Sequence, residues 1–193
     1  MSDLIAQAQQ LAADLLDSPT LAQRWAHVRG VGQRAVELTA TVEPAKRDLL
    51  VAASWLHDIG YAASLVDTGL HSLDGARYLQ QHGFPPELVG LVAHHTCARF
   101  EAAERGLANE LAIFPLDDGP LMDALVTADL TVGPQGQRLN ADERIAEILR
   151  RYPPQSQVHR AINRAAPLLL AHVRRTLDRL DHTALDDGQA RER

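Results

Sequence analysis

Apolar residues recur at helical spacing along most of the chain. Leu4, Leu11 and Leu15 fall on one face and predict a helix over residues 3–17. Ser18 followed by Pro19 is typical of a helix start, and the next apolar stripe predicts a helix that continues to about residue 41. No segment alternates apolar and polar residues as a half-buried strand would. The pattern therefore predicts an all-α fold.

Proline and glycine divide the remainder of the chain into further helices. Gly60 is expected to end the third helix, and Gly83 with the following prolines separates the fourth from the fifth. Asn140 is expected to cap a later helix. The predicted helices cover about residues 44–58, 71–83, 85–100, 121–131, 140–152 and 156–181. Residues 106–119 are predicted to be irregular, and the tail over 182–193 is expected to fray.

Composition supports one helical domain over residues 1–193. Hydrophobic residues make up 46% of the chain but aromatic residues only 4%, so the core must consist mainly of Leu, Val, Ile and Ala. This composition favours helices over a β-sandwich, because strands draw on β-branched and aromatic residues. No internal repeat, low-complexity linker or composition break divides the sequence. We therefore expect a single helical bundle.

Charge and cysteine content restrict the partners and the compartment. The formal net charge is −6 and no half of the chain is basic, which argues against extended nucleic acid as a partner. The single cysteine, Cys97, excludes an internal disulfide framework and fits a reducing compartment. No apolar run approaches the roughly 18 residues that a membrane span needs, and the acidic N-terminus is unlike a signal peptide. We expect a cytoplasmic protein without a membrane partner.

Two adjacent polar residues follow an apolar helix. His57 shares a helical face with Leu50 and Ala53, so its imidazole is expected to point inward. Asp58 lies about 100° further round the same helix end. Adjacent side chains at a helix terminus can converge on one ion, and Gly60 lets the chain turn away.

Two further polar residues lie on apolar faces. Asp129 continues the stripe of Leu121 and Leu125, and an inward carboxylate must be paired or bound to a metal. His27 lies on the same stripe as Val31, which again predicts an inward imidazole. Gly30 and Gly32, beside this histidine, would let another backbone pack closely.

Other histidines have both structural and functional interpretations. His71 opens a predicted helix, and His94 and His95 occupy consecutive positions in an apolar one. A single buried histidine is more often a hydrogen-bonded core residue than a ligand, and Asp129 alone could pair with an arginine. Cys97 is better explained as a small core thiol than as a soft ligand. His159, His172 and His182 are expected at the surface.

The combined order of these residues resembles the HD-domain metal hydrolases. The segments RWAHVRGVGQRAVELT, WLHDIGYA, HSLDGARYL, VAHHT and TADLT carry the resemblance over about residues 20–135. Their spacing is most similar to the HD proteins that split diadenosine tetraphosphate symmetrically. The matching positions are His27, His57, Asp58, His71, His95, Thr96 and Asp129.

This resemblance implies a metal site of one or two ions. His27, His57, Asp58 and Asp129 would form its basic shell. His71, with His94 or His95, would add a second ion that Asp58 bridges to the first. Which of the two adjacent histidines binds is left open, although the His-Thr match favours His95 and the tandem pair resembles cyclic-dinucleotide phosphodiesterases.

Two differences between this sequence and known HD-type hydrolases restrict the possible substrates. The segment TCARFEAAERG lacks the glycine-rich continuation of those phosphodiesterases, which disfavours a cyclic dinucleotide. After the His-Asp pair the chain reads IGYA, without the Glu-Asp pair of guanosine-tetraphosphate hydrolases. Residues beyond Asp129 carry no resemblance that identifies the substrate.

The expected function is metal-dependent hydrolysis of a phosphoester or phosphoanhydride bond in a small, nucleotide-like substrate. A metal-activated hydroxide would attack phosphorus. Asp58 and Arg24, one turn before His27, are the candidate catalytic residues. The resemblance favours iron or manganese, while cobalt, nickel, zinc and magnesium stay open. A di-iron HD-fold oxygenase and a metal-binding regulatory protein without turnover are the alternatives, and a homodimer is left open.

Overall fold

The computed structural model describes residues 2–191, with side-chain surroundings through Thr183. Helices account for the architecture, and the described residues form no β-strand. In chain order the helices are α1 (Asp3–Leu16), α2 (Ala22–Glu37), α3 (Arg47–Leu56), α4 (His71–Gln81), α5 (Pro86–His94), α6 (Arg99–Arg105), α7 (Ala108–Leu111), α8 (Pro120–Leu130), α9 (Ala141–Arg151) and α10 (Gln157–Arg191). The predicted all-α class is confirmed.

Two helix starts follow directly from local side-chain chemistry. The Ser2 side chain accepts a hydrogen bond from the backbone N–H of Ile5 at the start of α1. Asn140 caps α9, accepting a 2.8 Å bond from the Glu143 N–H while the Glu143 carboxylate accepts from the Asn140 N–H at 3.1 Å. These reciprocal bonds satisfy backbone donors that the helix leaves free. The predicted cap at Asn140 is confirmed.

One predicted helix is broken in two. Residues 85–100 were expected to be continuous, but α5 ends at His94, a 3₁₀ turn covers His95–Cys97, and α6 follows. Thr96 and Cys97 have φ values of 49° and 57°, in the left-handed region. Neither residue is glycine, so this conformation costs free energy that the surrounding structure must offset.

Other boundaries differ by shorter stretches. The helix expected to reach residue 41 ends at Glu37, and a 3₁₀ turn covers Thr39–Thr41. The region predicted to be irregular contains the short helix α7. Both differences involve one turn, for which the periodic pattern carries little information.

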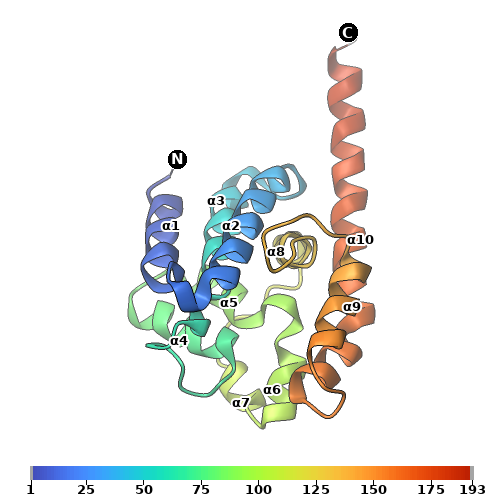
Figure 1. Ribbon diagram of the computed structural model, residues 1–193. Helices are drawn as coiled ribbons and strands as arrows, with labels where there is room; N and C mark the ends of the chain where they lie inside the picture. Colours follow the sequence, from blue (N-terminus) through green and yellow to red (C-terminus); the bar gives the residue numbers. More distant parts are fainter. Residues whose placement is uncertain (1, 192–193) are drawn as a thin grey trace.

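The last helix is longer than its predicted 156–181. It continues through Arg191, so the predicted tail is helical up to that residue, while residues 192–193 lie outside the described part. Figure 1 shows α10 as an upright helix along one side, with its C-terminal end extending beyond the other helices. None of the described helices is long and apolar enough to cross a membrane.

Helix α3 lies at the centre of the bundle. It contacts α1, α2, α5 and α8, while α10 covers the other side of α8 and contacts α6 and α9 (Figure 1). Leu50 and Leu56 of α3 are fully buried. Burial of such leucines stabilises the fold by about 1.5–3 kcal/mol each. Because α3 is enclosed, the residues at its C-terminal end are held deep in the molecule.

The glycines of α2 allow close approach, as predicted. A Cβ on Gly30 would lie 3.0 Å from the backbone of Gly136, in the loop after α8. A Cβ on Gly32 would lie 2.5 Å from the Trp55 ring, so this contact is to a side chain and not to a backbone. These contacts bring α2 against the segments that flank the buried polar residues.

Candidate metal centre

The end of α3 places two adjacent polar residues in the interior. The helix ends at Leu56, and a 3₁₀ turn begins at Ile59, so His57 and Asp58 occupy the corner between them. His57 is fully buried and Asp58 is only 3% exposed. Their side chains converge, with 3.2 Å between His57 Nε2 and Asp58 Oδ2. A buried carboxylate of this kind requires partners.

One group of three possible metal ligands combines α2, α8 and this corner. His27, His57 and Asp129 each offer a ligand atom, and these atoms lie within 4.8 Å of one another. His27 Nε2 is 3.0 Å from Asp129 Oδ1, and His57 Nε2 is 3.9 Å from the same oxygen. The three side chains are far apart in sequence and meet only because α2, α3 and α8 pack together.

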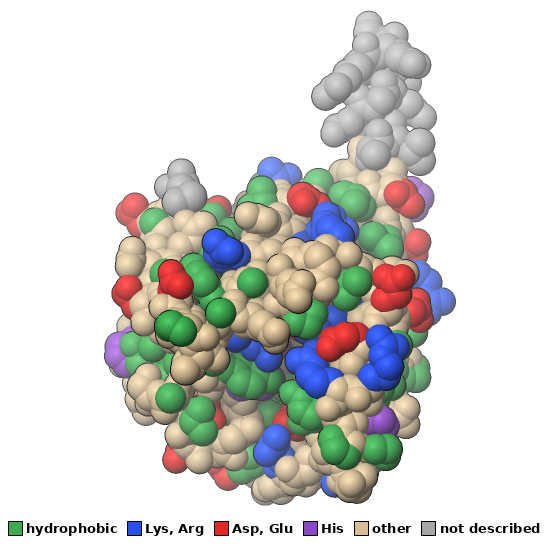
Figure 2. Space-filling model, viewed as in Figure 1, with side chains coloured by type: hydrophobic (Ala, Val, Ile, Leu, Met, Phe, Trp, Pro, Cys, Tyr) green, Lys and Arg blue, Asp and Glu red, His purple; other side chains and the backbone are tan. Residues whose placement is uncertain are grey.

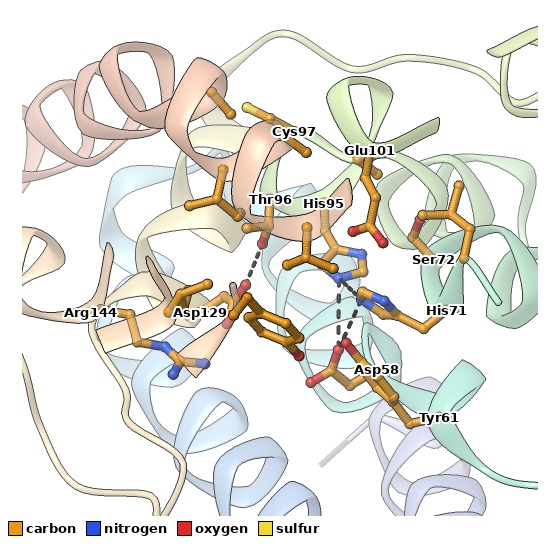
Figure 3. Close-up of a pocket in the computed structure, with 18 of the residues that line it drawn as sticks. Asp58, Tyr61, His71, Ser72, His95, Thr96, Cys97, Glu101, Asp129 and Arg144 are labelled. Carbon is orange, nitrogen blue, oxygen red and sulfur yellow. Dashed lines mark hydrogen bonds and ion pairs between the residues drawn. The ribbon is translucent and has the colours of Figure 1, made fainter. Parts of the chain in front are cut away.

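A second group combines the corner with the start of α4 and the end of α5. Asp58, His71 and His95 likewise offer ligand atoms within 4.8 Å of one another. Asp58 Oδ1 lies 3.3 Å from His71 Nε2 and 3.8 Å from His95 Nε2, and the two histidine nitrogens are 3.2 Å apart. Figure 3 shows these three side chains pointing toward one another.

The carboxylate of Asp58 joins the two groups. Its Oδ2 lies 3.2 Å from His57 Nε2 and 3.8 Å from His27 Nε2, while its Oδ1 faces His71. Each oxygen is therefore directed to a different set of imidazoles. A carboxylate in this position can bridge two cations.

The imidazole orientations fit metal binding. The Nδ1 atoms of three histidines lie within hydrogen-bond distance of backbone carbonyls: His27 of Gly133 at 3.2 Å, His57 of Ser54 at 2.8 Å, and His95 of Val92 at 2.7 Å. A proton on Nδ1 donated to each carbonyl leaves the Nε2 lone pair free for a metal. His57 Nε2 is buried and has no hydrogen-bond partner among the described residues.

A family model described as the HD domain matches residues 24–182. The chain belongs to the HD-domain family. The match includes every residue of the two ligand groups and extends beyond the range 20–135 suggested by the motifs, so it takes in α9 and much of α10. Proteins of this family are generally metal-dependent phosphohydrolases. No curated protein and no solved structure was found to match the chain.

Charge in this HD domain is balanced around the two carboxylates. Burial opposes the charge of Asp58, but Arg24 and His57 outweigh it and hold the pKa of Asp58 well below its ordinary value. Burial likewise opposes the charge of Asp129, and its bond to His27 dominates, so the pKa of Asp129 is lowered too. Both carboxylates are therefore ionised at neutral pH and available to cations.

Burial has the opposite consequence for two of the imidazoles. It lowers the pKa of His71 to about 3, although Asp58 raises it, and it also lowers the pKa of His95. Both side chains are thus neutral at physiological pH, and neutral imidazole is the form that ligates metals. For His57 burial also lowers the pKa, but Asp58 more than offsets this, and the net pKa is raised.

Arg24, a candidate catalytic residue, lies at the edge of the centre. Its Nη1 is 2.5 Å from Asp58 Oδ2, and its guanidinium carbon is 3.9 Å from the centre of the Tyr61 ring. Tyr61 in turn stacks on His71, with the ring centroids 4.2 Å apart. Arg24 lines the cavity beside the centre, so its charge faces both the carboxylate and the open space.

The structure separates the two adjacent histidines at the end of α5. His95 lies in the second ligand group, whereas His94 is turned toward a different part of the molecule. The Nε2 of His94 is 3.1 Å from the carbonyl oxygen of Phe114. His94 is therefore not brought to the described ligand groups. Cys97 also belongs to neither group; burial raises the pKa of its thiol to about 11, and it packs in the core.

Three residues at the site were not predicted to act there. The Thr96 hydroxyl donates a hydrogen bond to Asp129 Oδ2, which fixes that carboxylate (Figure 3). Tyr61 stacks on His71, and Arg144 of α9 lines the same cavity. Thr96 is part of the His-Thr pair that carries the family resemblance, so the sequence did contain a signal for its place at the site. Tyr61 and Arg144 have no comparable signal, because their positions depend on tertiary packing.

One surface prediction is wrong. His172 is only 3% exposed, and its Nδ1 lies 2.5 Å from Asp123 Oδ1 at the contact between α8 and α10. His182 is exposed as predicted. The pattern misplaced His172 because its buried partner, Asp123, lies on a different helix.

Proposed function

We propose that this HD domain is a metal-dependent hydrolase of phosphoester or phosphoanhydride bonds in a small, nucleotide-like substrate. One observation carries the proposal: Asp58 directs its two oxygens to two separate groups of imidazole ligands. Two cations sharing a carboxylate are a common arrangement in enzymes that cleave phosphate bonds.

The two ligand groups define the residues that would hold metal. His27, His57, Asp58 and Asp129 would hold one ion, and Asp58, His71 and His95 the other. Divalent ions held there would lower the pKa of a water molecule and offset charge on phosphoryl oxygens. Mixed imidazole and carboxylate ligands suit several transition metals, and the family resemblance favours iron or manganese.

Residues around the centre have separate tasks in this reaction. Arg24 would bind a phosphoryl oxygen, since its guanidinium lines the cavity beside the centre. Thr96 would keep Asp129 oriented through its hydrogen bond. The cavity beside the centre is open to solvent and is lined by Asp58, His71 and Arg24, so a small phosphorylated molecule could reach the ligand groups from it.

The first experiment measures metal content and phosphate release together. Protein purified without added metal is expected to contain about two ions per chain and to release phosphate from nucleotides or dinucleoside polyphosphates without oxygen. Asp58→Ala should abolish both properties, and His71→Ala should remove about one ion. Asp67→Ala is the matched control, because Asp67 is an exposed carboxylate paired with Arg77.

Two results would contradict the proposal. Normal metal content and activity in Asp58→Ala would reject the assignment of the centre. Oxygen-dependent oxidation of a substrate, without phosphate release, would instead identify an oxygenase.

A further inference from the structure

The short helix α9 directs two arginines toward the cavity of the proposed metal centre. Arg144 and Arg151 are seven positions apart, which places them on one side of the helix. Both line the cavity that also exposes Asp58 and His71. Figure 2 shows Lys and Arg side chains around a hollowed part of the surface, and Figure 3 shows Arg144 facing the interior of the pocket. The C-terminal part of the chain therefore contributes positive charge to the site.

Arg144 is buried to an extent unusual for arginine. Its exposure is 5%, and its Nε has no hydrogen-bond partner in the described part of the chain. Its Nη1 donates to Glu147 at 2.5 Å. A buried donor without an acceptor destabilises the protein, so a ligand that accepts a hydrogen bond from it would gain affinity.

Positive charge exceeds negative charge on this wall of the cavity. Glu147 accepts hydrogen bonds from Arg144 and also from Arg151, whose Nε and Nη2 lie 3.0 and 2.8 Å from its oxygens. One negative charge is thus shared by two positively charged guanidinium groups. Glu101, which also lines the cavity, is paired with Arg105 at 2.6 Å. The wall formed by α9 is suited to an anion.

The space next to the two arginines is mainly apolar. Ile148 of α9 and Tyr152, which follows the end of that helix, line the same cavity as Val158 and Ile162 of α10. A substrate that contacts both arginines would place its organic part against these side chains. Such a surface favours a ring or another flat apolar group over a fully polar one.

We propose that Arg144 and Arg151 bind the phosphate that neighbours the one held at the metal centre. This inference rests on the proposed function and makes the substrate class more specific: an organic diphosphate or oligophosphate, cleaved at a P–O–P bond. Water forms the new bond to phosphorus and the bridging P–O bond breaks. The leaving phosphate keeps the bridging oxygen, and the two protons of water pass to the products or to solvent.

The test compares two non-hydrolysed probes on the metal-loaded protein. Methylenediphosphonate presents two neighbouring phosphoryl groups and inorganic phosphate presents one. In calorimetric titrations the wild-type protein is expected to bind the diphosphonate more tightly. Arg144→Gln and Arg151→Gln should each weaken diphosphonate binding about tenfold or more, since each removes a charge-assisted contact. Phosphate binding and metal content should be unchanged.

Arg150→Gln is the matched control, since Arg150 lies on the same helix but is not among the residues that line the cavity. Thermal unfolding checks that Arg144→Gln is folded, because Arg144 is buried. Arg151 is exposed, so Arg151→Gln is not expected to affect folding. Equal weakening of both probes, or no effect of either arginine variant, would overturn the inference.

The outcomes separate this inference from the proposed function. Hydrolysis of diphosphates that does not depend on Arg144 or Arg151 would leave the metal-centre proposal standing and reject the arginine site. Diphosphonate binding that depends on both arginines, in a protein without any phosphate-releasing activity, would support the arginine site and reject the proposed function.

Discussion

At the scale of single residues, neighbouring histidines have different environments. His95 hydrogen-bonds the carbonyl of Val92 through Nδ1 and turns its Nε2 to Asp58, whereas His94 contacts the carbonyl of Phe114. Consecutive residues of a helix point about 100° apart, so the two side chains at the end of α5 reach different parts of the molecule. The extended backbone of His95, with ψ of 153°, then ends the helix.

Alanine variants of these two histidines should differ in metal content. His95→Ala removes an imidazole from the second ligand group, and we expect the protein to lose about one ion per chain. His94→Ala should retain the wild-type content, because His94 lies outside both groups. Elemental analysis of the two purified proteins measures the difference. An equal loss of metal in both variants would mean that His94 also ligates, as the tandem pair had left open.

The sequence predicts inward-facing side chains well where a helix has a polar face for contrast. His27 was predicted from the apolar stripe of α2, which has exposed residues on its other side, and it is buried. Asp129 was also predicted to face inward and is buried, but every residue of α8 from Leu121 to Leu130 is buried, so its burial does not test the pattern. The choice between His94 and His95 could not be predicted, because α5 is buried on nearly all sides. Periodicity indicates a direction only when some positions are exposed.

At the scale of helices, the break after α5 has no marker in the sequence. The segment VAHHTCARF contains neither glycine nor proline, yet Thr96 and Cys97 adopt left-handed φ values. The hydrogen bond from Thr96 to Asp129 forms only when α8 is in place, and it helps to offset the local cost. A periodic pattern cannot predict a break stabilised by another helix.

Gly60, in contrast, was expected to let the chain turn, and the structure shows how tightly it must turn. A Cβ at this position would lie 1.9 Å from the carbonyl oxygen of His71 and 2.8 Å from the backbone nitrogen of Gly75. Both atoms belong to the first turns of α4, so Gly60 sets the distance between α4 and the corner that holds Asp58.

Gly60→Ala should therefore disturb the second ligand group more than the first. We expect a loss of about 1–3 kcal/mol in the free energy of unfolding, because the added methyl group forces α4 outward. The same shift would move His71 away from Asp58 and weaken binding of one ion. Urea unfolding and metal titration measure the two effects.

Gly119→Ala is a suitable control, since its Cβ would meet only the Asp117 carboxylate, at 3.2 Å. Unchanged stability and metal binding in Gly60→Ala would show that α4 can shift without cost and that Gly60 does not position His71.

At the scale of the whole molecule, a buried ionic cluster connects α8 to α10. Asp123 is 1% exposed and accepts hydrogen bonds from Arg175 at 3.0 Å and Arg179 at 2.5 Å, with His172 also 2.5 Å away. The helical class was predictable because spacing is a local property. This contact was not, because its partners lie about fifty residues apart and the sequence does not specify which helices meet.

The cluster makes the stability of the whole fold depend on pH. Burial opposes the charge of Asp123, but its bonds to His172 and Arg175 outweigh burial and lower the pKa of Asp123. A depressed carboxylate pKa stabilises the fold above the unfolded pKa of about 4 and loses that contribution as pH falls toward the folded value.

Asp123→Asn should therefore destabilise the protein by about 3 kcal/mol near neutral pH, because two guanidinium groups lose their buried partner. The difference from wild type should shrink progressively below about pH 4, because the unfolded wild type then binds a proton at Asp123 that the folded state does not. Urea unfolding over a pH series measures it, with Asp178→Asn on the exposed face of α10 as the control. A difference that stays constant down to pH 2 would mean that the asparagine acts through packing and not through charge, and α10 would then be held to α8 by its apolar contacts alone.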